Sequence, residues 1–173
     1  MSVPEASDEA PAAIDLLLEQ VRATLQRVPA TDLPAAVDAG ALIVDIRPVE
    51  QRERDGEFPG AVVVDRNVLE WRLDPTSQFR LPEAADPARR IIIVCSEGYS
   101  SSLAAATLQQ LGRWNATDLI GGFQAWLADI GTISTGDRVE RPDGTPMKQQ
   151  LDSRTAKPHN YFVVEQASGG ASS

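Results

Sequence analysis

The sequence contains one cysteine, one histidine, few aromatic residues and a deficit of positive charge. A single cysteine permits no internal disulfide, and it excludes both a CxxC redox pair and a zinc site built from several thiolates. With 16 basic and 25 acidic residues, the formal net charge is -9 at pH 7. This argues against a nucleic-acid or anionic-membrane surface, because both partners need clusters of Lys and Arg. We predict no metal and no cofactor.

Long hydrophobic runs are also missing. No apolar segment approaches the roughly 20 residues of a membrane span. The first residues are acidic and rich in Ala and Pro, without the basic start and apolar run of a signal peptide. We therefore expect a cytoplasmic location. The 173 residues are enough for one domain with a proper core.

The most informative stretch surrounds the single cysteine, Cys95. Ile91–Val94 is a run of β-branched residues, which predicts a strand buried on both faces. Ser100 opens a predicted helix that ends near Gly112. A cysteine between such elements lies at the carboxyl edge of a parallel sheet, where ligands of open α/β folds bind. Loop N–H groups and a helix N-terminus would favour its thiolate, and an inert core cysteine is the alternative.

The rest of the chain alternates short apolar runs with amphipathic stretches. The further predicted strands are Ala41–Ile46, Ala61–Val64, Thr117–Ile120 and Tyr161–Val164. The further predicted helices are residues 12–27, Thr31–Gly40, Val49–Asp55, Asn67–Leu73 and Phe123–Leu127. Such alternation predicts an α/β fold with an open, mostly parallel sheet and helices on both faces.

Four separated motifs occur in order. They are Asp45-Ile46-Arg47, Gly56-Glu57-Phe58-Pro59-Gly60-Ala61, Cys95 with Gly98 and Ser101, and Gly121-Gly122-Phe123-Gln124-Ala125-Trp126. The ordered set resembles the single-domain rhodanese (sulfurtransferase) family. Its members carry Asp-x-Arg, Gly-His-Ile-Pro-Gly-Ala, a Cys loop with Gly in its fourth position, and Gly-Gly-x-x-x-Trp. The resemblance implies a rhodanese-like sheet and a reactive thiol.

The resemblance also suggests an organisation for the whole chain. We expect a disordered N-terminus at residues 1–11, an amphipathic helix at 12–27, a rhodanese-like domain at 28–131 and an irregular C-terminal extension at 132–173. The amphipathic helix either packs on the domain or serves dimerisation or partner binding. The oligomeric state stays open.

Family chemistry implies a double displacement at Cys95. The thiolate takes a sulfane sulfur from a small, thiosulfate-like donor and passes it to cyanide, a thiol or a protein acceptor. With no second cysteine, the persulfide must be resolved by an outside acceptor. The substrate-binding residues implied are those of the loop and one arginine, namely Ser96, Glu97, Gly98, Tyr99, Ser100, Ser101 and Arg47. A structural role for Arg47 with Asp45, holding the turn after the strand, is the alternative.

The loop departs from the family pattern in its charge. Many members carry Arg or Lys in the loop, whereas this loop has no cation and contains Glu97. A carboxylate there would repel thiosulfate and raise the pKa of the thiol, so we do not expect thiosulfate to be the natural donor. Arg47, Arg66 and Arg72 are the candidates for supplying positive charge.

Three other classes of protein share part of this pattern. The loop of a dual-specificity phosphatase is one residue longer and ends in an Arg that grips phosphate. Here the position that follows Cys95 after five intervening residues is Ser101, not Arg. A Cys-His hydrolase would have to recruit His159, the only histidine. The alternative with most support is a non-catalytic rhodanese-like binding module, which Glu97 favours and the retained Cys95 opposes.

Overall fold

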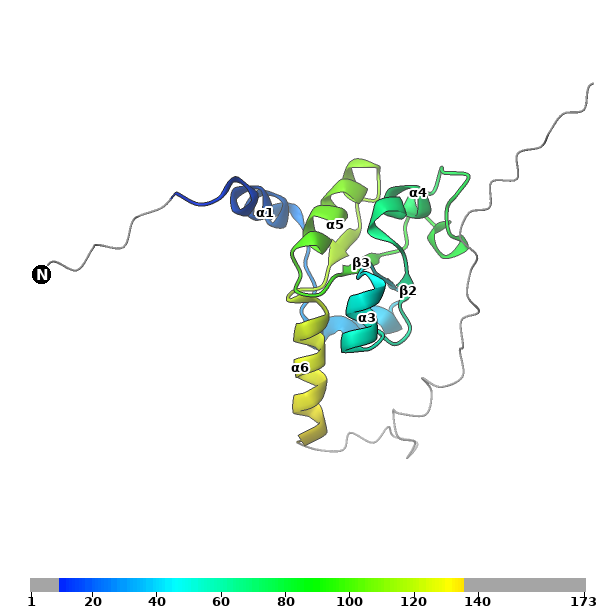
Figure 1. The fold of residues 1–173 in the computed structure, drawn as a ribbon. Coiled ribbons are helices and arrows are strands. Elements are labelled where there is room, and N and C mark those ends of the chain that lie inside the picture. The colour runs from blue at the N-terminus through cyan, green and yellow to red at the C-terminus, as the bar shows by residue number, and fades with distance from the viewer. Residues whose placement is uncertain (1–9, 136–173) are drawn as a thin grey trace, which may run out of the picture. The chain divides into compact units, whose positions relative to one another are not determined.

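The structure is a computed structural model, and it describes residues 10–135. A four-stranded parallel sheet lies at its centre, with the strand order β2-β1-β3-β4 (Figure 1). The strands are β1 (Leu42–Asp45), β2 (Val62–Val63), β3 (Ile91–Val94) and β4 (Ala116–Asp118). The predicted fold class is confirmed.

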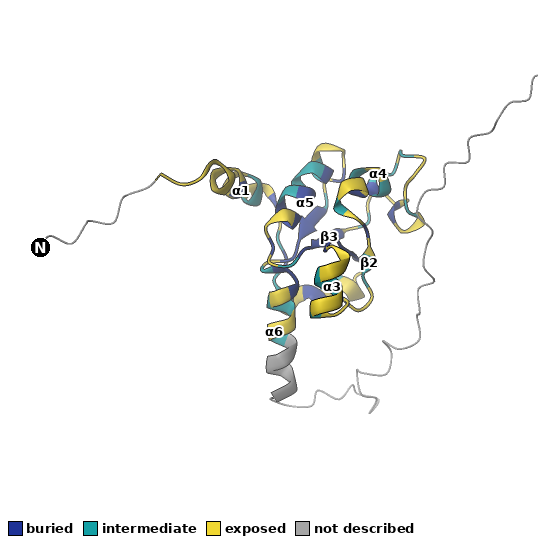
Figure 2. Cartoon of the chain, viewed as in Figure 1, coloured by how far each residue is buried: buried dark blue, intermediate teal, exposed yellow. Residues whose placement is uncertain are grey.

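The central strand β3 divides its side chains between two hydrophobic clusters. Ile91 and Ile93 belong to the first cluster, and Ile92 and Val94 to the second. This follows from the alternation of side chains along a strand, and it requires apolar residues at every position of a sheet covered on both faces. Strands β1, β3 and β4 are accordingly buried throughout, whereas the edge strand β2 is not, and the buried residues lie at the centre of the fold in Figure 2.

Helices cover both faces of the sheet. The first cluster includes residues of α4 (Leu69–Leu73) and α5 (Ser100–Gln110), and the second includes residues of α2 (Leu33–Asp38) and α6 (Gly122–Thr135). The remaining elements are α1 (Ala13–Thr24), α3 (Val49–Asp55) and the short 3-10 helices Ala30–Asp32, Arg66–Val68 and Pro82–Ala84. The expectation of helices on two faces is therefore confirmed.

Local sequence accounts for several boundaries. Helix α3 begins after Pro48, which is suited to a helix start, and ends at Gly56, whose φ of 95° few other residues adopt. Gly112, with a φ of 88°, follows the end of α5 in the same way. Both helices have the ends that the sequence predicts.

The C-terminal helix corrects one expectation. The prediction of a short helix over Phe123–Leu127 is wrong, because α6 runs from Gly122 to Thr135 and continues through Gly131. A glycine inside a helix costs only about 1 kcal/mol, and packing of the first turns of α6 on the sheet outweighs it. Strand β2 is also shorter than predicted, and the predicted strand Tyr161–Val164 lies outside the described residues.

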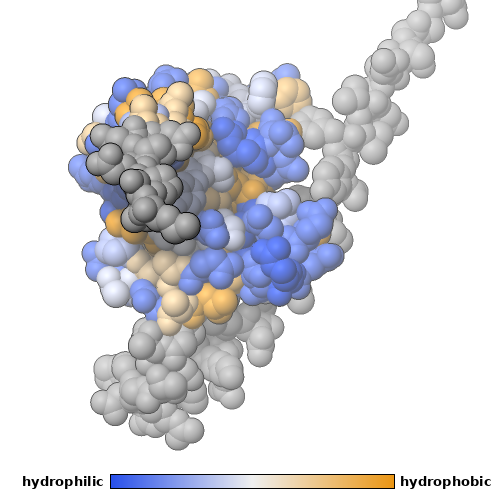
Figure 3. Space-filling model, turned by 60° about the vertical axis from the view of Figure 1, so that its left-hand side comes forward, coloured by the Kyte–Doolittle hydropathy of each residue, from blue (hydrophilic) through white to orange (hydrophobic). Residues whose placement is uncertain are grey.

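Helix α1 packs against α5 at the edge of the domain. Of the apolar residues of this predicted amphipathic helix, Leu18 is buried, while Ile14 and Leu17 are 50% and 44% exposed. The face drawn in Figure 3 combines a broad hydrophilic region with smaller hydrophobic patches. Within the described residues, no helix is both long and apolar enough to cross a membrane.

Candidate active site

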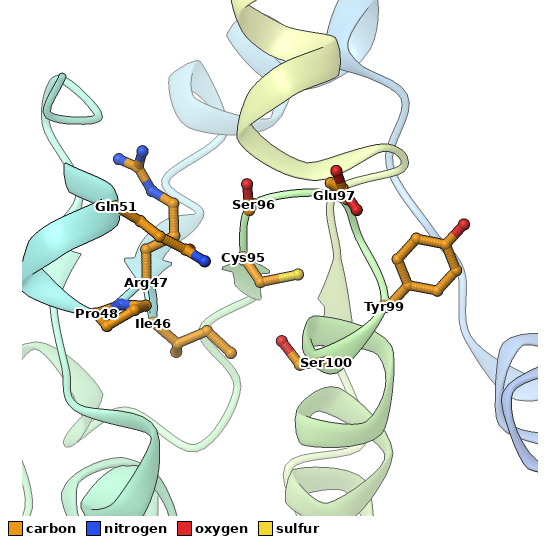
Figure 4. Close-up of a pocket in the computed structure, with 9 residues that line it drawn as sticks. All are labelled: Ile46, Arg47, Pro48, Gln51, Cys95, Ser96, Glu97, Tyr99 and Ser100. Carbon is orange, nitrogen blue, oxygen red and sulfur yellow. The ribbon is translucent and has the colours of Figure 1, made fainter. Parts of the chain in front are cut away.

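A pocket of about 240 Å³ lies where the chain leaves the two central strands (Figure 4). Its walls are Ile46, Arg47, Pro48 and Gln51 after β1, and Cys95, Ser96, Glu97, Tyr99 and Ser100 after β3. The connection after β1 leads to β2 on one side of the sheet, and the connection after β3 leads to β4 on the other side. The pocket therefore sits at the topological switch point, which is the usual ligand site of an open parallel sheet.

The sulfur of Cys95 points into this pocket and is surrounded by hydrogen-bond donors. The N–H of Gly98 donates to Sγ at 3.1 Å, and that of Ser101 at 3.4 Å. The Ser101 hydroxyl oxygen lies 3.2 Å from the same sulfur. Figure 4 shows Ser100 beside the sulfur at the start of α5. The loop thus forms a cradle that suits an anion.

These contacts change the acidity of the thiol. Burial alone raises the pKa of Cys95, but hydrogen bonds from the hydroxyls of Ser100 and Ser101 and from the N–H groups of Ser101 and Gly98 lower it. The outcome is a pKa below the ordinary value for cysteine. Since the thiolate is the nucleophilic form, the loop raises the reactive fraction of Cys95.

Three glycines, Gly98, Gly121 and Gly122, lie where the Cys95 loop packs closely against the start of α6. Gly98 has a φ of 80°, and a Cβ at this position would lie 2.8 Å from the nitrogen of Gly121. A Cβ on Gly122 would lie 2.5 Å from the carbonyl oxygen of Cys95. The first turn of α6 also donates to the loop, from Phe123 N–H to that same oxygen at 2.9 Å. The Gly121-Gly122 motif is therefore part of the scaffold of the loop.

A polar network supports the loop from behind. Asp118 at the end of β4 is completely buried and receives two bonds from Arg27, at 2.8 and 3.0 Å. The hydroxyls of Ser101 and Ser102 lie 3.0 and 2.7 Å from its Oδ2 atom. The carbonyl of Gly98 accepts bonds from Ser102, at 3.1 Å, and from Arg27, also at 3.1 Å. Arg27 thus donates to both the carbonyl and the carboxylate, whereas the single hydroxyl hydrogen of Ser102 can be donated to only one of them at a time.

Helix α1 also reaches the loop. The Arg22 guanidinium donates to the Gly98 carbonyl at 2.8 Å and to the Ser102 hydroxyl at 3.2 Å. Its charged group also lies over the ring of Tyr99, 5.2 Å from the centroid, in a cation–π arrangement. The N-terminal helix therefore fixes the outer side of the loop.

Arg47 and Asp45 form a buried ion pair. Both side chains are inaccessible to solvent, and Arg47 Nη2 lies 2.7 Å from Asp45 Oδ2. Arg47 also donates to the carbonyl of Gly56 at 2.9 Å, and its charged group packs on the ring of Phe123, 3.6 Å from the centroid. Asp45 in turn accepts the backbone N–H of Arg47. In Figure 4 the guanidinium points away from the sulfur, and these contacts favour the structural role for Arg47, although it also lines the pocket.

The predicted site residues fall into two groups. Those lining the pocket are Cys95, Ser96, Glu97, Tyr99, Ser100 and Arg47, whereas Gly98 and Ser101 contact the sulfur from the loop interior. Glu97 is exposed. Arg66 pairs with Glu70, and Arg72 donates to the carbonyl of Phe79. Neither of these arginines lines the pocket, so the structure does not bring them to the site as candidate cations.

Sequence reasoning missed Asp118, Arg27 and Ser102 as parts of the site. The available signal was a carboxylate within a short strand, since a buried acid needs a cationic or hydrogen-bonding partner. Among the described residues, no group of three or more His, Cys, Asp or Glu side chains could hold a metal ion. His159 lies outside the described residues.

The comparison with protein families decides the classification. The family model described as Rhodanese-like domain matches residues 29–129, which is more than half of the chain. The chain belongs to the rhodanese-like family. The resemblance inferred from the four motifs is confirmed.

Curated relatives in this family include two kinds of protein. The thiosulfate sulfurtransferase GlpE of Pseudomonas fluorescens is 32% identical over 114 residues, which are 65% of this chain and 94% of that protein. The adenylyltransferase and sulfurtransferase UBA4 of Lodderomyces elongisporus is 34% identical over 89 residues, 51% of this chain. The chain spans only 19% of that second, longer protein.

A solved structure supports the rhodanese-like fold. A Rhodopseudomonas palustris protein of unknown function, described as a possible tyrosine phosphatase, has a TM-score of 0.61 and 30% sequence identity to this chain. The match covers 75% of this chain and 97% of that protein. The similarity therefore extends over nearly the whole of a separately solved protein.

Proposed function

We propose that the protein is a sulfurtransferase in which Cys95 carries a sulfane sulfur as a persulfide. The observation that supports this most is the pair of N–H groups, of Gly98 and Ser101, that donate to Sγ, with the Ser101 hydroxyl oxygen 3.2 Å away, because such donors stabilise a thiolate and equally a terminal persulfide anion. The substrates are a small sulfur donor and a thiol or cyanide acceptor, and a protein acceptor fits the same chemistry.

The reaction consists of two displacements in which atoms and electrons balance. The Cys95 thiolate attacks the outer sulfur of a donor such as thiosulfate, the S–S bond of the donor breaks, and sulfite leaves with the electron pair. The acceptor, cyanide or a thiolate, then attacks the outer sulfur of the Cys95 persulfide. Thiocyanate or an acceptor persulfide departs, and the Cys95 thiolate is regenerated. An ionised thiol needs no general base, and the loop favours ionisation because it lowers the pKa of Cys95.

The loop charge argues for a donor other than thiosulfate. Glu97 lines the pocket and is exposed, while the lining arginine, Arg47, is committed to Asp45. A dianion approaching Cys95 would meet the Glu97 carboxylate without an accessible cation among the lining residues. A neutral or cationic donor, or a protein partner, meets no such barrier.

Two other activities fit less well. A phosphatase loop needs an Arg to grip the phosphate, whereas Ser101 occupies the corresponding place and is already engaged with Cys95 and Asp118. A non-catalytic rhodanese-like binding module is the second candidate, which the exposed Glu97 favours. The hydrogen bonds donated to the sulfur of Cys95 favour the enzyme over the binding module.

Intact-mass measurement tests the proposal. After incubation with thiosulfate, a persulfide donor or a polysulfide, and removal of excess donor, we expect the mass of one sulfur atom to be added. Cyanide should then remove this sulfur and release thiocyanate. Cys95→Ser is the control, and its mass should not change. Failure of every donor to add sulfur would refute the enzyme and leave the binding module.

A further inference from the structure

Asp118 is a buried carboxylate that the sulfur-transfer steps do not use. Its Oδ2 atom lies 3.0 Å from the Ser101 hydroxyl, and that hydroxyl lies 3.2 Å from the sulfur of Cys95. A full negative charge is thus separated from the nucleophile by one side chain. In a buried site, such a charge disfavours a second anion nearby. Something must offset Asp118 if Cys95 is to be a thiolate.

Ser101 has one hydroxyl hydrogen and two acceptors for it. If the hydrogen is donated to Asp118, the sulfur loses the hydroxyl as a donor and keeps only the N–H groups of Gly98 and Ser101. If it is donated to the thiolate, the Asp118 Oδ2 atom must be satisfied by its other partners. The state of Asp118 therefore decides how well Ser101 can stabilise the anionic sulfur.

Arg27 supplies the missing compensation. It lies between α1 and the sheet, and its Nε and Nη2 atoms donate to the two carboxylate oxygens of Asp118 at 2.8 and 3.0 Å. The carboxylate is completely buried and the Arg27 side chain is 16% exposed, so solvent screens the pair weakly. This bidentate bond neutralises Asp118 and reduces its demand for the Ser101 hydrogen.

We propose that Arg27 is a positioning residue for the nucleophile, acting through Asp118 and Ser101 so that the Ser101 hydroxyl is free to donate to the Cys95 thiolate. The inference rests on the proposed role of Cys95 as the nucleophile. It makes the segment after α1 part of the catalytic machinery. It also supplies positive charge from behind the loop, in place of the loop cation that is absent here.

Other charged groups near the loop do not take this role. They are Glu97 in the loop itself, Arg22 on α1, and the Asp45–Arg47 pair after β1. Glu97 is exposed, Asp45 and Arg47 compensate each other, and Arg22 bonds to the Gly98 carbonyl and the Ser102 hydroxyl. In the described part of the chain, Arg27 is the arginine that donates hydrogen bonds to Asp118.

The pH dependence of Cys95 alkylation by iodoacetamide tests this on the full chain. Arg27→Gln removes the charge but keeps a polar side chain, and it should move the alkylation midpoint upward by about one pH unit. Arg27→Lys should restore most of the shift. Asp118→Asn, which leaves the Arg27 charge without its partner, should move the midpoint downward. Arg54→Gln removes an arginine from an exposed Arg–Asp pair and should leave the midpoint unchanged.

The opposite signs separate charge compensation from structural damage. A merely disturbed loop would move the midpoint in the same direction for Arg27→Gln and Asp118→Asn, and that result would overturn the proposal. So would an unmoved midpoint in Arg27→Gln when its melting temperature shows a folded protein. Alkylation measures the thiol without any sulfur donor. Failure of sulfur uptake in the unmodified protein would therefore refute the proposed function. The alkylation midpoints test the positioning role of Arg27 independently of that result.

Discussion

Replacing Gly98 by alanine should disrupt the Cys95 loop, because the added methyl group would collide with backbone atoms. The new Cβ would lie 2.8 Å from the nitrogen of Gly121 and 3.1 Å from both the nitrogen of Gly122 and the carbonyl oxygen of Leu119. All three are backbone atoms, and ordinary contact begins only at 3.4 Å. Relief therefore requires movement of the loop or of the start of α6.

The expected loss has two parts. The φ of 80° is unfavourable for alanine by about 1–2 kcal/mol. The collision resembles an overpacked core and adds about 1–3 kcal/mol. We expect the free energy of unfolding of Gly98→Ala to fall by about 2–5 kcal/mol.

A matched control isolates the collision. Gly40 has a similar φ of 92°, but nothing lies within 4 Å of a Cβ built there. Gly40→Ala should therefore lose only the conformational part, about 1–2 kcal/mol. Urea unfolding followed by tryptophan fluorescence measures both variants. Equal losses in the two would refute the argument that close packing of the loop requires Gly98.

Three further predictions concern charge. Glu97→Arg should raise kcat/KM for thiosulfate several-fold, because it replaces a repulsive group at the pocket by an attractive one. The control is Glu83→Arg, which makes the same charge change at an exposed position of the 3-10 helix Pro82–Ala84. If kcat/KM rises no more in Glu97→Arg than in this control, Glu97 does not set donor choice. The pKa of Cys95 is lowered from 9.0, so the thiolate is present above that lowered pKa and is lost as the pH falls through it. The rate of sulfur uptake should follow this profile in stopped-flow measurements, and a midpoint at or above 9.0 would contradict the donor cradle. Asp45→Asn should lower the free energy of unfolding by about 3–5 kcal/mol, because it leaves the buried Arg47 guanidinium without its carboxylate. A loss below about 1 kcal/mol in urea unfolding would show that the buried Asp45–Arg47 pair does not hold this turn together.

Much of the fold could be predicted because its signals are local. Four β-branched residues at Ile91–Val94 predict a buried strand, and Pro48 with Gly56 marks both ends of α3. The reach of α6 could not be predicted in this way. Gly131 is a helix breaker by propensity, whereas the packing of the first turns of α6 on the sheet depends on residues far away in sequence.

The candidate site was predictable to the same local extent. Cys95 and its loop follow from a strand, a turn and a helix that are contiguous in sequence. Arg27 and Asp118 are 91 residues apart, and no periodicity links them. Their pairing emerges only when the segment after α1 is placed along the edge of the sheet, where Val28 pairs with Leu119. Sequence patterns thus locate Cys95, the proposed nucleophile, but not the groups behind it.

The attachment of α6 to the loop has a consequence for how such a site can diversify. The carbonyls of Cys95 and Ser96 are occupied by N–H groups of the first turn of α6, and the Gly98 carbonyl by arginines. Carbonyl oxygens therefore face the protein, and N–H groups face the sulfur. The backbone of the loop therefore supplies two of the hydrogen bonds to the sulfur, while the exposed side chains of Glu97 and Tyr99, which do not contact the sulfur, are available to determine the choice of partner. Under the proposed function, substitutions at those positions can then change the sulfur donor or acceptor while the backbone contacts of Cys95 stay in place.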